Sequence, residues 1–179
     1  MALEKAWAAV AERAEKKEYT IRFLNDTYQL DLARKQVSSL SCNVPAKTFY
    51  SIILLHYLER TLQGLAPLEN EWISFQELPG GQAYYPAFKK RVIDTIARKY
   101  QHAPETLLEL PKRFPARKDK VADLSVVLEV CEKVPVLITF WRGDEEFHPE
   151  ANMLFDKNIN AIFCTEDIVV VAEIIAHSI

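Results

Sequence analysis

Near the start of the chain, apolar residues recur every three or four positions and predict an N-terminal helix. The apolar stripe consists of Leu3, Trp7, Val10 and Ala14, and charged residues surround it. This spacing places the four side chains on one face of a helix. We expect the helix to span residues 1–18 and to end at the charged run EKKE.

The next segment alternates between apolar and polar residues, which is the pattern of a β-hairpin. The alternation runs through residues 19–23 and again through residues 28–32. Each half has the two-residue period of a strand with one buried face. Asn25-Asp26 lies between the halves, and both residue types are common in tight turns. We therefore expect two antiparallel strands joined at this turn.

Two further helices are predicted to begin at a proline. Pro45 opens a helix that runs to Gly64, and Pro86 opens another. Proline suits the first turn of a helix, where its missing N–H would have had no partner. Glycine suits the left-handed position after the last turn. Residues 71–85, which lie between these helices, are predicted to be irregular.

The last third of the chain contains the strongest strand signals. Val126–Val130 and Val134–Trp141 are rich in β-branched and apolar residues, and we expect them to form an antiparallel pair. The second run is almost continuously apolar, which is typical of a strand covered on both faces. Residues 103–120, which precede this pair, are expected to form a short helix followed by an exposed basic connection.

A polar turn, a short helix and a final helix are expected to follow. The short helix is predicted to begin at Pro149, and Thr165 is placed to cap the final helix. The buried stripe of that helix is predicted to contain Ile168, Val171, Ile174 and Ile175.

Together these elements predict one α+β domain over residues 1–179, with antiparallel β-hairpins packed with about four or five α-helices. A chain of 179 residues, 49% apolar and 26% charged, can bury a core without a metal or a disulfide. The formal net charge of −3 gives no field that would draw the chain to nucleic acid or anionic lipid. No run of 18 apolar residues provides a membrane-spanning helix. We therefore expect neither nucleic acid nor a membrane as a partner.

Several enzyme classes lack their usual signatures here. The four glycines cannot build the phosphate loops of dinucleotide-binding or P-loop proteins. Neither a GxSxG nucleophile elbow nor an HExxH zinc motif occurs. The widely spaced Cys42, Cys131 and Cys164 fit neither a disulfide framework nor a cluster-ligand set, so we expect reduced thiols in a cytoplasmic protein. The sequence indicates no particular cofactor.

The first candidate site is the acidic turn that follows the second strong strand. It contains Trp141, Asp144, Glu145, Glu146 and His148. These residues could contact a ligand or partner, and Asp144, Glu146 and His148 could hold a divalent cation. Crowded carboxylates could also give one carboxyl a raised pKa for acid–base chemistry. The alternative is a solvated turn in which Arg142 pairs with one of the acids.

The second candidate site is the aromatic segment around a Pro-Gly-Gly turn. It contains Trp72, Glu77, Gly80, Gly81, Tyr84 and Tyr85. Aromatic side chains with polar tips beside flexible backbone can form the wall of a ligand site. The alternative is a loop whose rings fill the core. Asp156 is a third candidate, which either turns inward toward a ligand or serves as a cap or turn residue.

Two motif blocks of the chain resemble a known family. The motifs are W-x-S-F-x-E-L-P-G-G-x-x-Y and W-x-G-D-E-E-F, the second followed by L-F-D and E-D. With them the chain resembles, from about residue 20 to its C-terminus, a domain-of-unknown-function family found mainly in anaerobic bacteria and archaea. The residues that match the motifs are Trp72, Glu77, Gly80, Gly81, Tyr84, Trp141, Asp144, Glu145, Glu146, Asp156, Glu166 and Asp167.

The resemblance implies a setting in anaerobic one-carbon, corrinoid or iron–sulfur-linked metabolism, but it implies no reaction. Some members of that family carry an added four-cysteine iron–sulfur motif of the type seen in corrinoid-dependent methyl-transfer systems. This chain lacks that motif, so the resemblance implies a corrinoid or iron–sulfur protein as a partner that would supply any cluster. His148 stands where the family pattern leads us to expect proline, which weakens a family-wide metal role for this histidine.

Three functions are compatible with the sequence. The first is an accessory or binding module, in which the aromatic segment and the acidic turn form one cleft for a cofactor or a partner protein. The second is an enzyme that uses Asp144, Glu145 or Glu146 for acid–base or metal chemistry, with Tyr84 or Tyr85 as a proton donor. It requires those carboxylates to be partly buried beside a tyrosine hydroxyl. The third is a structural or interaction protein with no small-molecule site.

Overall fold

Two antiparallel β-sheets form the framework of the protein, which the computed structural model describes over all 179 residues. The smaller sheet has the order β1-β2-β3-β4, with β1 Glu18–Phe23, β2 Asp26–Asp31, β3 Gln36–Ser39 and β4 Val44–Pro45. The larger sheet has the order β5-β9-β8-β7-β6, with β5 Trp72–Ser74, β6 Ala116–Asp119, β7 Leu124–Cys131, β8 Val134–Trp141 and β9 Glu150–Asp156. The predicted α+β class is confirmed.

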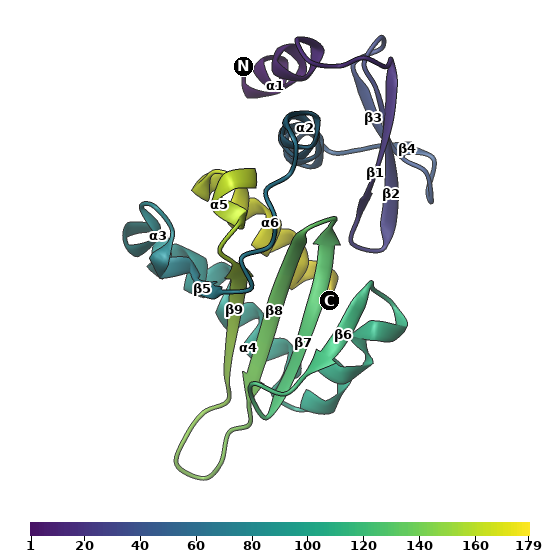
Figure 1. Cartoon of the computed structure of the whole chain (residues 1–179). Coiled ribbons are helices and arrows are strands. Elements are labelled where there is room, and N and C mark those ends of the chain that lie inside the picture. The colour runs from purple at the N-terminus through teal and green to yellow at the C-terminus, as the bar shows by residue number, and fades with distance from the viewer.

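Six α-helices and three other helical segments pack with these sheets. The α-helices are α1 Ala2–Ala11, α2 Thr48–Gln63, α3 Gly81–Phe88, α4 Asp94–Tyr100, α5 Ile159–Ile162 and α6 Thr165–Ser178. The others are the 3-10 segments η1 Phe75–Glu77 and η3 Pro104–Lys112 and the π-helical segment η2 Lys89–Ile93. Figure 1 shows α1, α2 and the smaller sheet at one end of the molecule, with α4 and α6 behind the larger sheet. None of the helices combines the length and the apolar character needed to cross a membrane.

One continuous core joins both sheets to the helices. It contains 46 buried apolar residues, which extend from α1 to the last residue of the chain. Every residue of β8 from Val134 to Phe140 is buried, as its sequence predicted. The predicted stripe of α6 is also buried, and it consists of Ile168, Val171, Ile174 and Ile175. Each such side chain contributes about 1.5–3 kcal/mol to the free energy of unfolding, so burial on this scale needs no metal or disulfide.

Both predicted strand pairs are present. β7 pairs with β8 in antiparallel register, with Val126 opposite Ile138. β1 pairs with β2, but the turn lies one residue earlier than predicted, because Asp26 already pairs with Phe23. Leu24 therefore takes a turn position, with a φ of 53°.

The N-terminal helix is shorter than predicted. It ends at Ala11 rather than near residue 18. The backbone N–H groups of Glu15 and Lys16 instead donate to the Tyr19 hydroxyl, at 3.0 and 3.1 Å. Residues 15–17 are exposed and charged, so a longer helix would have buried no further apolar surface there.

Neither predicted proline position opens a helix. Pro45 pairs with Ser38 across β4 and β3, and α2 begins three residues later. Gly64 does end α2, with a φ of 94°. Pro86 lies inside α3, which begins at Gly81, so residues 71–85 are less irregular than predicted. Proline supplies no N–H to the helical ladder, and the chain widens into the π-helical η2 shortly after it.

Three predictions in the second half of the chain are also wrong. Part of the expected basic connection forms the edge strand β6, where Ala116 pairs with Leu128. Pro149 precedes strand β9 rather than a helix, because alternate residues of β9 point into the core. Thr165 does not cap α6: Cys164 occupies the N-cap, and the Thr165 hydroxyl donates to the Pro79 carbonyl at 2.7 Å.

Candidate functional site

The aromatic segment is organised by its own hydrogen bonds. The Glu77 carboxylate accepts from the backbone N–H of Ser74 at 2.6 Å and from its hydroxyl at 2.8 Å, which forms a capping box on η1. These hydrogen bonds hold the pKa of Glu77 below its ordinary value. Glu77 is therefore an ionised cap residue.

The two glycines of this segment serve the turn into α3. Gly80 has a φ of 75°, a left-handed conformation that favours glycine. Gly81 is buried, and a Cβ atom there would lie 2.0 Å from the Phe75 carbonyl oxygen. The backbone geometry of the turn therefore accounts for both glycines without a ligand.

The aromatic rings of the segment do not converge on one cavity. Tyr84 is 54% exposed, whereas Tyr85 is half-buried with its ring centroid 6.4 Å from that of Phe88. Tyr84 lines a small hollow of about 80 Å³ against Thr165 and Glu166 at the start of α6. Ligand sites for small molecules have volumes of roughly 300–1,000 Å³, so this hollow is too small for a cofactor.

Asp156 holds backbone in place. Its carboxylate accepts from the N–H groups of Glu69 at 3.0 Å, Asn70 at 2.8 Å and Asn158 at 3.1 Å. The residue is only 3% exposed. It pairs with half-buried Trp72 across β9 and β5, and so it fixes the segment that leads into β5. The turn-residue alternative explains its position.

The acidic turn faces solvent. Asp144, Glu145 and Glu146 are all exposed. The Asp144 carboxylate accepts from the N–H groups of Glu146 and Phe147, each at 2.8 Å, and these bonds lower its pKa. The prediction of a carboxyl with a raised pKa is therefore wrong for Asp144. Arg142 pairs with Glu105 of η3 rather than with an acid of the turn.

The weak metal candidates do not form a ligand set. No group of three or more histidine, cysteine, aspartate or glutamate side chains in the protein is arranged to hold a metal ion. Asp144, Glu146 and His148 therefore do not form such a group, and they are spread along the exposed loop.

The aromatic segment and the acidic turn do not meet in one cleft. Trp72 pairs with Asp156 at one end of β9, and Trp141 pairs with Glu150 at the other end. Six residues of strand at about 3.3 Å each separate these pairs by about 20 Å. Figure 1 shows the β8–β9 loop at the lower end of the larger sheet and α3 beside its upper end. A binding site shared by the aromatic segment and the acidic turn is not formed.

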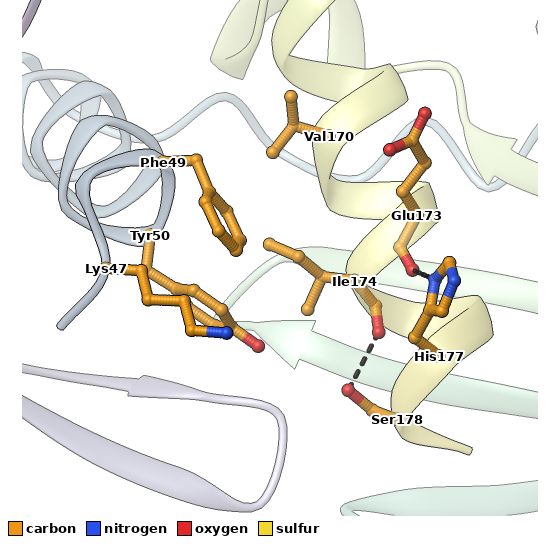
Figure 2. Close-up of a pocket in the computed structure, with 8 residues that line it drawn as sticks. All are labelled: Lys47, Phe49, Tyr50, Val170, Glu173, Ile174, His177 and Ser178. Carbon is orange, nitrogen blue, oxygen red and sulfur yellow. Dashed lines mark hydrogen bonds between the residues drawn. The ribbon is translucent and has the colours of Figure 1, made fainter.

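A different hollow lies between α2 and α6, and no candidate residue of the sequence analysis lines it. Its volume is about 510 Å³, within the range of small-molecule sites. Figure 2 shows Phe49 and Tyr50 from the start of α2 facing Val170 and Ile174 of α6. Phe49 is 42% exposed. The remaining lining residues are Lys47, Glu173, His177 and Ser178.

The polar groups of this hollow leave it with an unpaired cation. Lys47 is exposed and takes part in no salt bridge. Glu173 is paired with Arg91 at 3.2 Å. Burial raises the pKa of Tyr50, so its hydroxyl keeps its proton and can donate. The hollow therefore combines an apolar wall with a cation and a hydroxyl donor.

His177 adds an orientable ring nitrogen at the edge of the hollow. Its Nδ1 lies 2.7 Å from the Glu173 backbone carbonyl oxygen, which can only accept. Nδ1 therefore carries the proton, and in the neutral ring Nε2 is left as an acceptor. His177 lies in the last turn of α6, close to the helix C-terminus.

The remaining titratable candidates lie outside the hollow. His56 of α2 bonds through Nδ1 to the Asp167 carboxylate of α6 at 2.8 Å. Cys131 is fully buried, and burial raises the pKa of Cys164 to about 11. Cys42 is exposed and precedes β4.

Comparison with known protein families gave one match. The family model described as "Domain of unknown function (DUF3786)" matches residues 3–178. It therefore covers nearly the whole chain, including α1, which lay outside the region of the resemblance. Searches of curated proteins and of solved structures gave no match.

Proposed function

We propose that this chain, which belongs to the DUF3786 family, is a binding module that holds a small organic anion with an aromatic or other apolar body. The observation that carries the proposal is the hollow between α2 and α6. It is large enough for such a molecule, and half of its lining residues are hydrophobic. Small-molecule sites commonly combine a predominantly apolar wall with a few polar groups that fix orientation.

The lining residues suggest how the ligand lies. Phe49, Val170 and Ile174 offer apolar surface to a ring or chain. Lys47 and the Tyr50 hydroxyl are the donors for a carboxylate, sulfonate or phosphate group. Since Glu173 is already paired with Arg91, its charge opposes an anion less than a free carboxylate would. A half-exposed phenylalanine beside an unpaired lysine thus favours an amphipathic anion over a neutral or cationic molecule.

The acid–base enzyme alternative lacks the geometry that it requires. It needs partly buried carboxylates next to a tyrosine hydroxyl, whereas Asp144, Glu145 and Glu146 are exposed. Tyr84 and Tyr85 belong to α3, near the opposite end of β9. A binding role needs neither condition.

The proposal is tested with a pair of fluorescent probes that share one ring system. 1-Anilinonaphthalene-8-sulfonate carries a sulfonate, and N-phenyl-1-naphthylamine lacks it. Phe49→Ala removes apolar contact to both probes, so the affinity for each probe should fall by about tenfold. Lys47→Gln should lower the affinity for the sulfonate probe by about threefold and leave the affinity for the uncharged probe unchanged.

Matched controls lie elsewhere on the surface. Leu68→Ala shortens an exposed apolar side chain outside the hollow, and Lys5→Gln removes an exposed charge from α1. Neither should change the affinity for either probe. Equal affinities across wild type, Phe49→Ala and Lys47→Gln would show that the probes do not occupy the hollow and would contradict the proposal.

The partner implied by the family resemblance remains a further proposal. On that basis we propose that the module works beside a corrinoid or iron–sulfur protein. Isolation of the protein with its partners under exclusion of oxygen, followed by a visible absorption spectrum and metal analysis, tests this. Near-stoichiometric cobalt or iron in the isolated complex would support it, and a colourless, metal-free complex would contradict it.

A further inference from the structure

The end of β8 and the loop that follows it present two large aromatic side chains to solvent. Trp141 is 40% exposed and Phe147 is 69% exposed. Both line a second hollow, of about 530 Å³, together with Arg142, Glu146, His148 and Glu150. Two exposed aromatic side chains that line one hollow form an apolar patch, and an exposed apolar patch rimmed by polar residues marks an interaction site.

The charge around this hollow is negative. Glu146 and Glu150 line it, and Asp144 and Glu145 belong to the same loop. The one strong cation of the loop, Arg142, is paired with Glu105. The backbone N–H of Arg142 also donates to the Asp123 carboxylate at 3.0 Å, which adds a further acid at the base of the loop. The hollow therefore joins aromatic faces to unpaired carboxylates.

Such a combination is complementary to a cation with flat faces. Aromatic rings attract a cation placed over their faces, at about 0.5–2 kcal/mol according to its exposure. A guanidinium group can stack on a ring and pair with a carboxylate at the same time, whereas an ammonium group is smaller and more strongly hydrated. Arginine is also enriched where protein surfaces meet.

We propose that this loop is a docking surface for a positively charged face of a partner protein, with an arginine side chain of the partner seated between Trp141 and Phe147. The proposal concerns the opposite end of β9 from the aromatic segment, and it is independent of the hollow between α2 and α6. The loop projects from the end of the larger sheet (Figure 1), which suits contact with a side chain carried by a protein surface.

The loop was singled out in the sequence for its acids, but its geometry assigns the main contact to the aromatic residues. The Asp144 carboxylate accepts hydrogen bonds from two backbone N–H groups of the turn. Gly143 permits the close approach of Pro149, because a Cβ atom on residue 143 would lie 2.7 Å from Pro149. These two residues shape the loop. Trp141 and Phe147 are free to contact a partner, and the carboxylates provide charge complementarity.

The test measures binding of a fluorescein-labelled peptide with three arginines spaced by glycine and serine. The matched peptides carry lysine or the uncharged isostere citrulline at the same positions. We expect the arginine peptide to bind at least threefold more tightly than the lysine peptide and the citrulline peptide not to bind measurably. Trp141→Ala and Phe147→Ala should each lower the affinity for the arginine peptide by about tenfold.

Two control variants separate this surface from general attraction to an acidic protein. Leu68→Ala removes an exposed apolar side chain elsewhere, and Glu12→Gln removes an exposed acid from the end of α1. Neither variant should change the affinity for the arginine peptide. The double variant Glu146→Gln/Glu150→Gln should reduce the dependence of that affinity on salt concentration. Phe49→Ala should also leave peptide binding unchanged, so failure here and failure of the α2–α6 site are distinguishable.

Three outcomes would overturn the proposal. The arginine and lysine peptides could bind equally, Phe147→Ala could bind as wild type does, or Leu68→Ala could weaken binding as much as the loop variants. A concentration-dependent dimer in sedimentation that Trp141→Ala abolishes would instead assign the loop to a second copy of this chain. Because Phe147 is largely exposed, its variant should fold even if Trp141→Ala does not.

Discussion

Three acidic side chains of the motif blocks accept hydrogen bonds from nearby backbone N–H groups. Asp156 receives three N–H groups, and Asp144 and Glu77 receive two hydrogen bonds each. An acidic residue that accepts several backbone N–H groups is fully explained by the turn or cap that it holds. Residue types alone do not distinguish this role from catalysis, because both use an ionised carboxylate close to the backbone.

Asp156→Asn tests this structural role. The amide replaces one acceptor oxygen with a donor that faces backbone N–H groups, and the residue is too buried for water to compensate. We expect a loss of about 2 kcal/mol in the free energy of unfolding, measured by urea denaturation. Asp144→Asn is the matched control, since it also removes an acceptor from backbone N–H groups but in an exposed turn. A loss at Asp156 no larger than at Asp144 would contradict this role.

The His56–Asp167 pair makes stability depend on pH. The hydrogen bond to the Asp167 carboxylate raises the pKa of His56 above its ordinary value of 6.5, and burial partly opposes the shift. A raised folded-state pKa means that the charged histidine stabilises the folded protein. This contribution is fully present below pH 6.5 and is lost as the pH rises through the folded-state value.

His56→Gln isolates this contribution because glutamine does not titrate. We expect the free energy of unfolding of wild type minus that of His56→Gln to be largest near pH 5.5 and to fall steadily toward pH 8.5. Urea denaturation at intervals across this range measures it. A difference that stays constant or grows with pH would show that His56 is not stabilised in its charged form.

Among the elements, those with a clear period were predictable. The hairpin β1–β2, the pair β7–β8 and the buried stripe of α6 follow from alternation or helical spacing. The misplaced helix starts came from proline, which is equally acceptable in a strand at a sheet edge, as at Pro45, and before a strand, as at Pro149. The alternation that defines β9 was present in the sequence, but its polar neighbours favoured a turn and helix.

The turn into α3 depends on close packing at one glycine. Gly81→Ala would place a methyl group against the Phe75 carbonyl oxygen, and we expect a loss of about 3 kcal/mol or more in the free energy of unfolding. Gly80→Ala meets no atom within 4 Å and should cost only about 1 kcal/mol for its positive φ. Thermal and urea unfolding of the two variants provide the comparison. Similar losses at both positions would contradict the packing role of Gly81.

On the scale of the whole molecule, the candidate site was not predictable from local sequence. The hollow joins residues 47–50 to residues 170–178, which are more than 100 positions apart in the chain. Its members are an ordinary lysine, aromatic residues and aliphatic residues, without a motif or a fixed spacing. The only local signal was Phe49, an apolar residue at the first turn of α2 that the fold leaves half-exposed. The aromatic segment and the acidic turn were conspicuous in sequence, yet the topology places them at opposite ends of β9.

A two-dimensional ¹H–¹⁵N spectrum of the protein titrated with 1-anilinonaphthalene-8-sulfonate tests most directly whether a small organic anion binds between α2 and α6. We predict saturable one-to-one shifts confined to amides at the start of α2 and in the last two turns of α6, with residues 141–150 unchanged. The absence of saturable shifts, or shifts centred on another part of the molecule, would contradict the claim.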